Sequence, residues 1–279
     1  MNIKIMTYNI QHGLDYQQVL KLRNGAKAPD LQNMTPEEKE KRSKAIRHQE
    51  DPSRIRLDKM ARVITAQGAK IVALNEVRDE SQHPCFTPQA QLLSDMTGLP
   101  YHYFGKAIDI KDQGPYGNGL LSAYPFISCE TIPIPDPVVK DEDAYYETRC
   151  LIKAVLDISA DAAEDDPKTL TVFVTHMGLA RQEAKNAVAT VLSNVAEDEN
   201  AILMGDFNVT PDSDILLPLR EKFKDAGDLL FPGAFSWPSE EPERKIDYIF
   251  GHGKVTFASA AIPPIVVSDH RPHTATILL

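Results

Sequence analysis

Carboxylate, amide and imidazole side chains recur in this sequence where apolar, strand-like segments end. The apolar segment 71–74 leads to Glu76, and the β-branched segment 169–175 ends at His176. The residues at such positions are Asn9, Glu76, His176, Asp206, Asn208, Asp247, Asp269 and His270. Because strand ends on one edge of a sheet can converge on a single cleft, we expect these side chains to form one site. Such a set could hold a metal ion, activate a water molecule and direct an imidazole at a substrate.

The segment Gly205-Asp206-Phe207-Asn208 combines an acid with an amide. Residues two apart in an extended chain point the same way, so Asp206 and Asn208 can address one atom while Phe207 anchors the loop. An aspartate that accepts a proton beside an asparagine that donates a hydrogen bond can hold and activate a water molecule. Taken alone, the pair is explained equally well as a polar turn that closes the strand.

Glu76 follows a buried apolar segment, where an unpaired charge would be costly. A hard divalent cation would remove that cost, and the oxygen atoms of Glu76, Asp269 and the Asn9 amide suit Mg²⁺ or Mn²⁺. A zinc site would be expected to use cysteine or more histidine. For a lone glutamate, a salt bridge with Arg78 or another cation is the more common explanation.

The adjacent residues Asp269 and His270 could serve one site in different ways. The acid can bind a metal while the imidazole addresses the substrate. An imidazole in that role needs a second acid to fix its tautomer, and Asp247 is the candidate partner. Taken alone, a surface Asp-His pair is the favoured explanation here, and most single histidines such as His176 are ordinary structural or surface residues.

Arg149 and Asn118 are candidates for binding a substrate phosphate. Arg149 lies inside a predicted strand, where a bidentate guanidinium could grip a phosphate, and an exposed strand arginine is equally plausible. Asn118 stands between Gly117 and Gly119. It could face a phosphate or occupy a turn with positive φ, and the turn is slightly favoured.

The elements that must position these residues are mostly strands. Strands are predicted at 2–10, 70–77, 101–107, 119–123, 144–158, 169–175, 201–204, 246–250, 255–261 and 274–279. Helices are predicted from a start at Thr35-Pro36, at 57–64, at 88–97 and after His176 to about 196. With 279 residues and 42% hydrophobic content, this order favours one α/β domain with two packed sheets.

Composition limits the partners. The 30 Lys+Arg against 40 Asp+Glu give a net charge of −10, which disfavours a long nucleic acid. The segment 37–62 is locally basic and could grip one phosphate, although a solvated helix face is the more common explanation. The sequence predicts neither a signal peptide nor a transmembrane segment. Its odd number of cysteines, Cys85, Cys129 and Cys150, fits a reducing compartment, so we expect a cytoplasmic protein.

Seven short segments together resemble the endonuclease/exonuclease/phosphatase superfamily, in that family's order and over nearly the whole chain. They are Thr7-Tyr8-Asn9-Ile10, Leu74-Asn75-Glu76-Val77, Gly119-Leu120-Leu121-Ser122 with Tyr124-Pro125, Thr175-His176-Met177, Gly205-Asp206-Phe207-Asn208, Ile246-Asp247-Tyr248-Ile249 and Ser268-Asp269-His270. The resemblance implies a four-layer α-β-β-α sandwich, the DNase I-like fold, which hydrolyses phosphoester bonds with a divalent metal, usually magnesium. It implies a single domain over 1–279, with a helical insert at about 15–53.

The resemblance also implies how a metal and a water molecule would be held. Glu76 would be the principal metal ligand, helped by Asn9 and Asp269. Asp206 would orient or deprotonate the attacking water, and Asn208 would hold the water or the phosphate.

Other matched positions would handle the substrate. His270, paired with Asp247, would stabilise the charge that develops on the phosphorus centre, and His176 would contact the scissile phosphate or assist the leaving group. Arg149 resembles the phosphate-contacting arginine of some branches that do not cleave DNA. The sequence departs from the family at Asn75, where glutamine is more common.

The predicted function is therefore divalent-metal-dependent hydrolysis of a phosphoester, as a phosphodiesterase or phosphatase. A nuclease acting on DNA or RNA is the alternative within the same class, and a catalytically silent binding module on the same scaffold is the alternative from another class. A small-molecule or lipid-headgroup phosphoester is the expected partner. A strong cysteine nucleophile motif and a glycine-rich phosphate loop are both missing from the sequence, which disfavours covalent and nucleotide-driven chemistry.

Overall fold

The computed structural model describes residues 1–25, 35, 55–80, 87–110, 114–140, 145–163, 167–197 and 199–279. The strands are β1 (Asn2–Asn9), β2 (Ile71–Arg78), β3 (Tyr101–Ile110), β4 (Gly114–Ser122), β5 (Phe126–Pro133), β6 (Cys150–Asp157), β7 (Thr169–His176), β8 (Ala201–Asp206), β9 (Lys224–Asp225), β10 (Asp247–His252), β11 (Thr256–Ala261) and β12 (His273–Leu278). The α-helices are α1 (Tyr16–Gly25), α3 (Leu57–Gln67), α4 (Gln89–Thr97), α5 (Arg181–Asn194) and α6 (Leu217–Arg220). Short 3₁₀ helices are η1 (Gln11–Gly13), η3 (Asp214–Leu216) and η4 (Ala226–Leu229).

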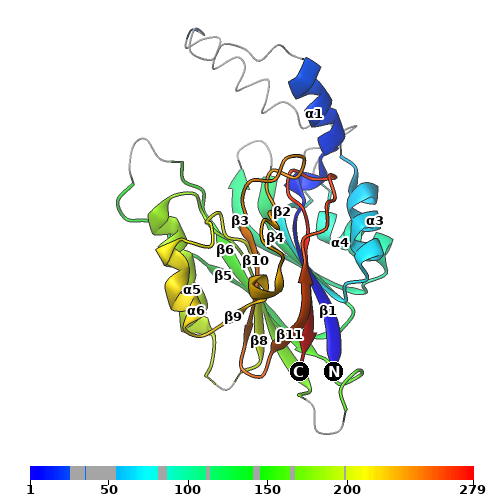
Figure 1. The fold of residues 1–279 in the computed structure, drawn as a ribbon, viewed down its shortest axis with the longest axis vertical. Coiled ribbons are helices and arrows are strands. Elements are labelled where there is room, and N and C mark those ends of the chain that lie inside the picture. Colours follow the sequence, from blue (N-terminus) through cyan, green and yellow to red (C-terminus); the bar gives the residue numbers. More distant parts are fainter. Residues whose placement is uncertain are drawn as a thin grey trace.

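The strands form two six-stranded sheets that pack face to face (Figure 1). The first sheet has the order β11-β12-β1-β2-β4-β3, and the second has the order β5-β6-β7-β8-β10-β9. Each sheet contains one parallel pair, β1 with β2 and β7 with β8, while the other neighbours are antiparallel. The carboxyl ends of these four strands lie at the end of the molecule opposite the two termini (Figure 1).

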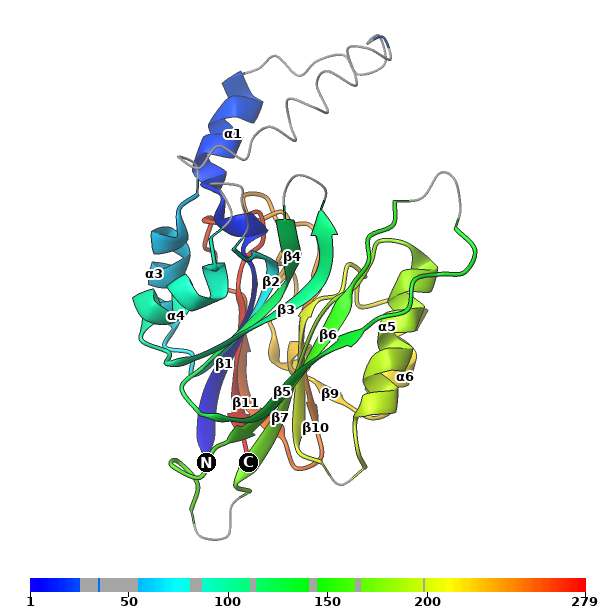
Figure 2. The same ribbon diagram turned by 180° about the vertical axis from the view of Figure 1, so that it is seen from behind.

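Three hydrophobic clusters join the layers. Ile5 and Ile249 belong to the cluster between the sheets. Met60 of α3 packs with residues on the outer face of the first sheet, and Leu219 of α6 packs with residues on the outer face of the second. Figure 2 shows the two helical layers on opposite sides of the paired sheets. The four-layer α-β-β-α sandwich expected from the sequence is therefore confirmed.

Alternation along β1 shows why the sequence makes a doubly covered strand. Ile3 and Ile5 enter the cluster between the sheets, whereas Met6 and Tyr8 face the helical layer. Because successive side chains point to opposite faces, both faces of the strand are apolar and buried. The same alternation directs Asn9 towards the space between the sheets, in line with Ile3 and Ile5.

The predicted strands all correspond to observed strands, and two observed strands were not predicted. β5 lies at the edge of its sheet and is only partly buried, so its pattern is irregular. β9 has only two residues. The predicted helices at 57–64, at 88–97 and after His176 correspond to α3, α4 and α5.

Two local predictions were wrong. The strand predicted over 144–158 begins only at Cys150, so Arg149 lies just before it. The backbone N–H of Glu147 donates to the Glu183 carboxylate (3.0 Å), which anchors this segment to α5 instead of to a strand. Asn118 lies inside β4 and not in a turn. Its neighbour Gly117 is needed for close strand approach, because a Cβ there would lie 2.0 Å from a backbone oxygen of β3.

The insert predicted at about 15–53 begins as helix α1, and the rest of it, including the helix start at Thr35-Pro36, is outside the described residues apart from Thr35 itself. The base of α1 is tied to the body of the protein. The Tyr16 hydroxyl donates to the Glu240 carboxylate (2.7 Å), and Lys59 of α3 pairs with Asp15 (2.8 Å).

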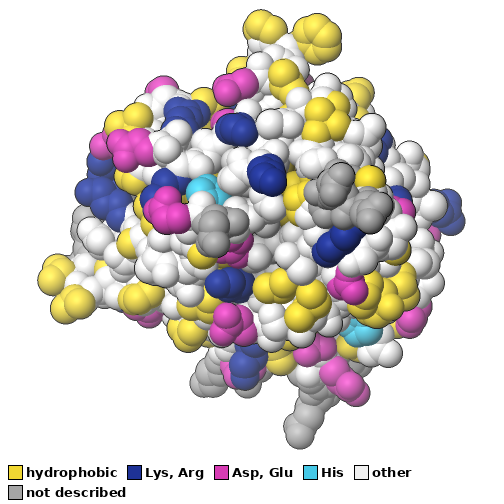
Figure 3. Space-filling view, turned by 90° about the horizontal axis from the view of Figure 1, so that it is seen from below, with side chains coloured by type: hydrophobic (Ala, Val, Ile, Leu, Met, Phe, Trp, Pro, Cys, Tyr) yellow, Lys and Arg dark blue, Asp and Glu magenta, His cyan; other side chains and the backbone are white. Residues whose placement is uncertain are grey.

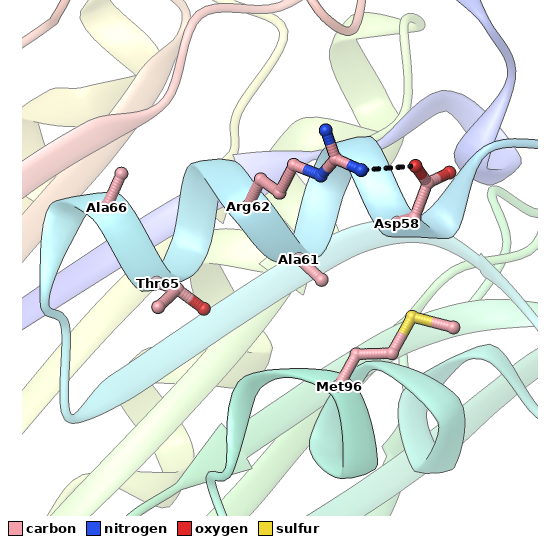
Figure 4. A pocket seen from close by; sticks show the side chains of 6 residues that line it. All are labelled: Asp58, Ala61, Arg62, Thr65, Ala66 and Met96. Atoms are coloured by element: carbon pink, nitrogen blue, oxygen red, sulfur yellow. Dashed lines mark ion pairs between the residues drawn. The ribbon is translucent and has the colours of Figure 1, made fainter.

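The surface at the end that carries both termini mixes basic and acidic side chains (Figure 3). On the outer helical layer, a groove of about 530 Å³ lies between α3 and α4 (Figure 4). Its lining residues are Asp58, Ala61, Arg62, Thr65, Ala66 and Met96. They all belong to the two helices, so the groove is separate from the strand ends. Across the described part of the chain, the helices are too short or too polar to span a bilayer.

Substitution of Gly205 tests how closely β7 and β8 must approach in the second sheet. It pairs with Thr175 of β7, has φ +151°, and an added Cβ would lie 1.8 Å from the Thr175 oxygen. We expect Gly205→Ala to lower the free energy of unfolding by about 3 kcal/mol, because the strands must separate to admit the methyl group. Chemical denaturation measures this loss.

The control is Gly233→Ala. Gly233 also has positive φ, but apart from its chain neighbours no atom of the described residues lies within 4 Å of a Cβ there. In this variant the free energy of unfolding should fall by only about 1 kcal/mol, which is the cost of placing alanine in the left-handed backbone conformation. Equal losses in the two variants would show that close strand approach at Gly205 is unimportant.

Candidate active site

The ends of β1, β2, β7 and β8, the start of β10 and the loop before β12 bring the predicted polar residues together. Strand register sets their neighbours: Asn9 is opposite Asn75, His176 is opposite Asp206, and Asp206 is opposite Asp247. Asp206 and His270 come from segments far apart in the chain, yet the Asp206 Oδ2 and His270 Nε2 atoms are 3.5 Å apart. The convergence expected from the strand ends is present in the structure.

Asp206 lies at the centre of this group and is 1% exposed. Its Oδ2 atom accepts a hydrogen bond from Asn9 Nδ2 (3.1 Å) and lies 3.5 Å from the Nε2 atoms of both His176 and His270. Burial raises the pKa of Asp206 to about 7, although the charge of His270 opposes the rise. A buried carboxylate with such a pKa is suited to accept a proton near neutral pH.

His270 and Asp247 form a buried pair. The His270 Nδ1 atom lies 2.9 Å from Asp247 Oδ2. Burial alone would lower the pKa of His270, but the carboxylates of Asp247 and Asp206 outweigh it and raise that pKa well above its usual value. The surrounding carboxylates therefore favour the charged form of His270, which can direct one N–H to Asp247 and the other towards Asp206.

Glu76 reaches the site through a local irregularity of β2. Pairing with β4 shifts register between Leu74 and Val77, and Glu76 has φ +57°. Regular alternation would place Asn75 between the sheets and Glu76 on the opposite face. The bulge instead turns the Glu76 carboxylate to Asn9, whose Nδ2 donates to it (3.2 Å). The Glu76 side chain is 23% exposed, which gives it access to solvent.

Asp269 lies near the same edge. Its carboxylate accepts a hydrogen bond from the Ser268 hydroxyl (3.2 Å). Burial raises the pKa of Asp269 to about 6; His270 opposes this rise and Glu76 adds to it. The charge of Glu76 thus disfavours the ionised form of Asp269, and a bound cation would relieve this repulsion.

The donor set fits a hard divalent cation. One amide nitrogen, Asn9 Nδ2, donates hydrogen bonds to the carboxylates of both Glu76 (3.2 Å) and Asp206 (3.1 Å). Two acidic side chains therefore face the same N–H donor group. The ligand atoms available there are oxygens, which Mg²⁺ and Mn²⁺ prefer.

A second group of possible ligands is Asp206, Asp247 and His270, whose ligand atoms all lie within 4.8 Å of one another. All three side chains are buried, and His270 Nδ1 is already bonded to Asp247. A cation held there would have to replace a proton of the His270 ring and would take Asp206 from its place beside the ring. The partly exposed Glu76 is the better centre for a cation that a substrate must reach.

The structure modifies the expected geometry of Asn208. Asn208 has φ +55°, so the chain is not extended there, and its N–H donates to Asp206 Oδ1 (3.0 Å). Its Nδ2 donates to the Met177 oxygen (2.9 Å). Phe207 is fully buried against Tyr248, with ring centroids 5.0 Å apart, and anchors the loop as predicted.

Asn118 is held inside the protein. Its Oδ1 accepts from Asn75 Nδ2 (2.8 Å), and its Nδ2 donates to the Cys150 oxygen (3.0 Å). Asn75 also donates to the Thr175 oxygen (2.9 Å) and accepts from the Asp206 N–H (2.9 Å). These two amides therefore bridge the sheets beneath the site, and Asn75 is a site residue that the sequence analysis noted only as a departure from the family.

His12 was not predicted as a site residue. It follows β1 in the left-handed region, with φ +56°, and its Nε2 lies 3.5 Å from Glu76 Oε2. Burial lowers the pKa of His12 to about 4, although Glu76 opposes this. The available signal was the polar run Gln11-His12-Gly13 directly after a site strand.

Arg149 contacts three side chains near the end of β7. The Nη1 atom lies 2.6 Å from Glu147 Oε1, 3.2 Å from His176 Nδ1 and 3.4 Å from the Tyr116 hydroxyl. Arg149 is 7% exposed. The structure therefore places this predicted phosphate-binding residue directly behind His176.

Comparison with known protein families identifies the family of this chain. The sequence profile of the Endonuclease/Exonuclease/phosphatase family matches residues 6–270. The chain belongs to this family. Members of the endonuclease/exonuclease/phosphatase family are phosphoester hydrolases. A comparison with curated protein sequences finds no significant match.

Solved structures confirm the DNase I-like fold of this family. An endonuclease/exonuclease/phosphatase from Beutenbergia cavernae DSM 12333 is 20% identical, with a TM-score of 0.72 over 100% of this chain and 72% of that one. A mannosyl-6-phosphatase of Bacteroides thetaiotaomicron VPI-5482 is 14% identical, with a TM-score of 0.69 over 99% and 100% of the two chains. TDP2 of D. rerio, complexed with a single-strand DNA product, is 15% identical, with a TM-score of 0.60 over 100% and 99%.

Proposed function

We propose that this chain is a divalent-metal-dependent phosphoester hydrolase that uses water as its nucleophile. The observation that carries the proposal is the buried series Asp247–His270–Asp206 beside the partly exposed carboxylate of Glu76. Hydrolysis of a phosphoester needs an activated water molecule, neutralisation of charge on the non-bridging oxygens and help for the departing oxygen. The site has a candidate group for each need.

Glu76 would hold Mg²⁺ or Mn²⁺, with Asn9 and Asp269 helping. Such a cation, when bound, neutralises charge on phosphate oxygens and acts as a Lewis acid. For Asn9 to contribute its Oδ1 atom, the amide would have to turn over, since Nδ2 now faces the two carboxylates. A cation held by Glu76 would favour the turned amide, because it would bind the amide oxygen and not the N–H group.

Asp206 would accept the proton of the attacking water. Its burial raises the pKa of this carboxyl to about 7, so it can take a proton and return it near neutral pH. The Asn208 N–H fixes Asp206 Oδ1 (3.0 Å), which leaves Oδ2 directed into the site. Asn208 would hold the water or the phosphate beside it.

His270 would stabilise the negative charge that develops on phosphorus. Asp247 keeps the ring oriented and charged, so its Nε2–H can donate to a phosphate oxygen. His176, whose Nε2 also lies 3.5 Å from Asp206 Oδ2, would contact the scissile phosphate as a second donor or assist the leaving group.

A small-molecule or lipid-headgroup phosphoester is the proposed substrate class. The net charge of −10 opposes attraction of a long nucleic acid. Relatives with this fold include a mannosyl-6-phosphatase and a TDP2 bound to a DNA product, so the fold alone does not choose between the classes. Hydrolysis of DNA or RNA remains the alternative.

The proposal predicts metal-dependent turnover of at least one small phosphoester. A panel of sugar phosphates, inositol phosphates, sphingomyelin, a chromogenic diester, RNA, plasmid DNA and abasic duplex, assayed with Mg²⁺, with Mn²⁺ and with chelator, measures this. We expect activity with metal that falls by about 10³-fold in chelator, and higher kcat/KM on a small substrate than on the polymers. Preference for a polymer would favour the nuclease. Lack of turnover combined with lack of metal-dependent stabilisation would favour a silent binding module.

A further inference from the structure

The two histidines that flank Asp206 have opposite environments. His270 is bonded to a carboxylate, whereas His176 is bonded to a guanidinium: Arg149 Nη1 lies 3.2 Å from His176 Nδ1. Both contacts are buried, and both rings direct Nε2 towards Asp206 Oδ2 at 3.5 Å. The sequence role expected for Arg149, direct grip on a phosphate, does not account for this contact.

The chemistry of the guanidinium fixes the proton on His176. Arginine carries only donors and stays protonated. A hydrogen bond from Arg149 to His176 Nδ1 therefore requires a lone pair on Nδ1. A neutral imidazole with a lone pair on Nδ1 has its proton on Nε2, the atom that faces Asp206.

We propose that Arg149, oriented by Glu147, is a positioning residue that holds His176 as the neutral Nε2–H tautomer. His176 then presents one hydrogen-bond donor to a phosphate oxygen without carrying a charge. The use of that donor on a phosphate rests on the proposed function, while the tautomer itself does not.

The electrostatics of the site agree with this assignment. Burial lowers the pKa of His176 well below its usual value, and Arg149 and His270 lower it further. A second imidazolium beside His270 and Arg149 would place three cations together. This arrangement favours one charged and one neutral histidine, and each directs an Nε2–H towards Asp206 Oδ2.

Glu147 is what keeps the guanidinium in place. Its Oε1 atom lies 2.6 Å from Arg149 Nη1, and its Oε2 accepts from the Tyr145 hydroxyl (2.6 Å). Its backbone N–H is bonded to Glu183 of α5. A buried arginine needs a partner of opposite charge, and Glu147 is that partner. Glu147 is itself held in place through both its carboxylate and its backbone N–H.

The tautomer can be measured without substrate or metal. Long-range ¹H–¹⁵N NMR of uniformly labelled protein distinguishes the two imidazole tautomers and the charged ring, and the signals missing from His176→Asn assign this residue. We expect wild-type His176 to be neutral with its proton on Nε2 from about pH 6 to pH 8. A proton on Nδ1, or a charged ring in that range, would overturn the proposal.

Substitutions test whether Arg149 is responsible. Arg149→Met removes the donor, so His176 should show both tautomers or bind a second proton in the same pH range. Arg149→Gln keeps an N–H donor and should keep the wild-type tautomer. Arg181→Met is the control, because Arg181 pairs with Asp214 on the surface and should leave the His176 signals unchanged. An unchanged single Nε2–H tautomer in Arg149→Met would also overturn the proposal.

The wild-type measurement decides the tautomer even where a variant does not fold. Glu147→Gln offers a second variant, because it keeps the guanidinium and removes only its charged partner; we expect partial loss of the single tautomer. A chain that hydrolyses no phosphoester yet shows the Nε2–H tautomer would refute the proposed function and leave this inference intact. Phosphoester hydrolysis with a different His176 tautomer would refute this inference and leave the proposed function intact.

Discussion

Replacement of Asp206 by asparagine is expected to lower kcat by about 10³-fold, because the site loses the group that accepts the proton of the attacking water. The same substitution should not reduce stability. Burial makes the charged carboxylate costly, which is why its pKa is raised to about 7. Asparagine has nearly the same shape without that cost, so the melting temperature should stay level or rise.

Steady-state kinetics and thermal unfolding measure the two effects. The control is Asp109→Asn, which removes an exposed aspartate that pairs with the surface residue Lys106, and which should change neither quantity. Wild-type kcat in Asp206→Asn would exclude Asp206 as the base. A large loss of stability would mean that Asp206 is needed mainly for folding.

Replacement of Glu76 by glutamine is expected to have the second large effect. Glutamine keeps the size of the side chain and removes the charge that would hold the cation. We expect kcat/KM to fall by about 10³-fold, equivalent to about 4 kcal/mol of transition-state stabilisation.

The same variant should also lose its response to metal. At about 100 times its Kd, Mg²⁺ should stabilise the wild-type protein by about 2.7 kcal/mol, and this shift should be nearly abolished in Glu76→Gln. Glu130→Gln, on the exposed edge strand β5, is the matched control and should keep the full shift. If Mg²⁺ stabilised Glu76→Gln as much as the wild-type protein, the metal would bind at a site other than Glu76.

Much of the fold was predictable because local pattern and burial agree along most of the chain. Segments such as 71–74 and 169–175 are apolar and strand-like, and their strands form as expected. The exceptions are set by distant partners. β5 is an exposed edge strand, and the backbone N–H of Glu147, just before β6, is bonded to the Glu183 side chain of α5. Sequence periodicity contains no information on such a contact.

The site was predictable as a set of residues but not as a geometry. The expected convergence of Asn9 and Asp206 is present, because β1 and β8 finish at the same end of the sandwich, and His270 joins them from the loop before β12. The bulge that turns Glu76 inward depends on register with β4, which cannot be read from local sequence. The bridge of Asn75 between the sheets depends on packing in the same way.

The most direct test of the account is where a cation binds. Crystals soaked in Mn²⁺ and measured at the manganese absorption edge would locate the ion by its anomalous signal. We predict one principal peak at about 2 Å from a Glu76 carboxylate oxygen, with Asp269 and the turned Asn9 amide beside it. A principal peak between Asp206, Asp247 and His270, or a Glu76 carboxylate without a manganese peak, would contradict the account.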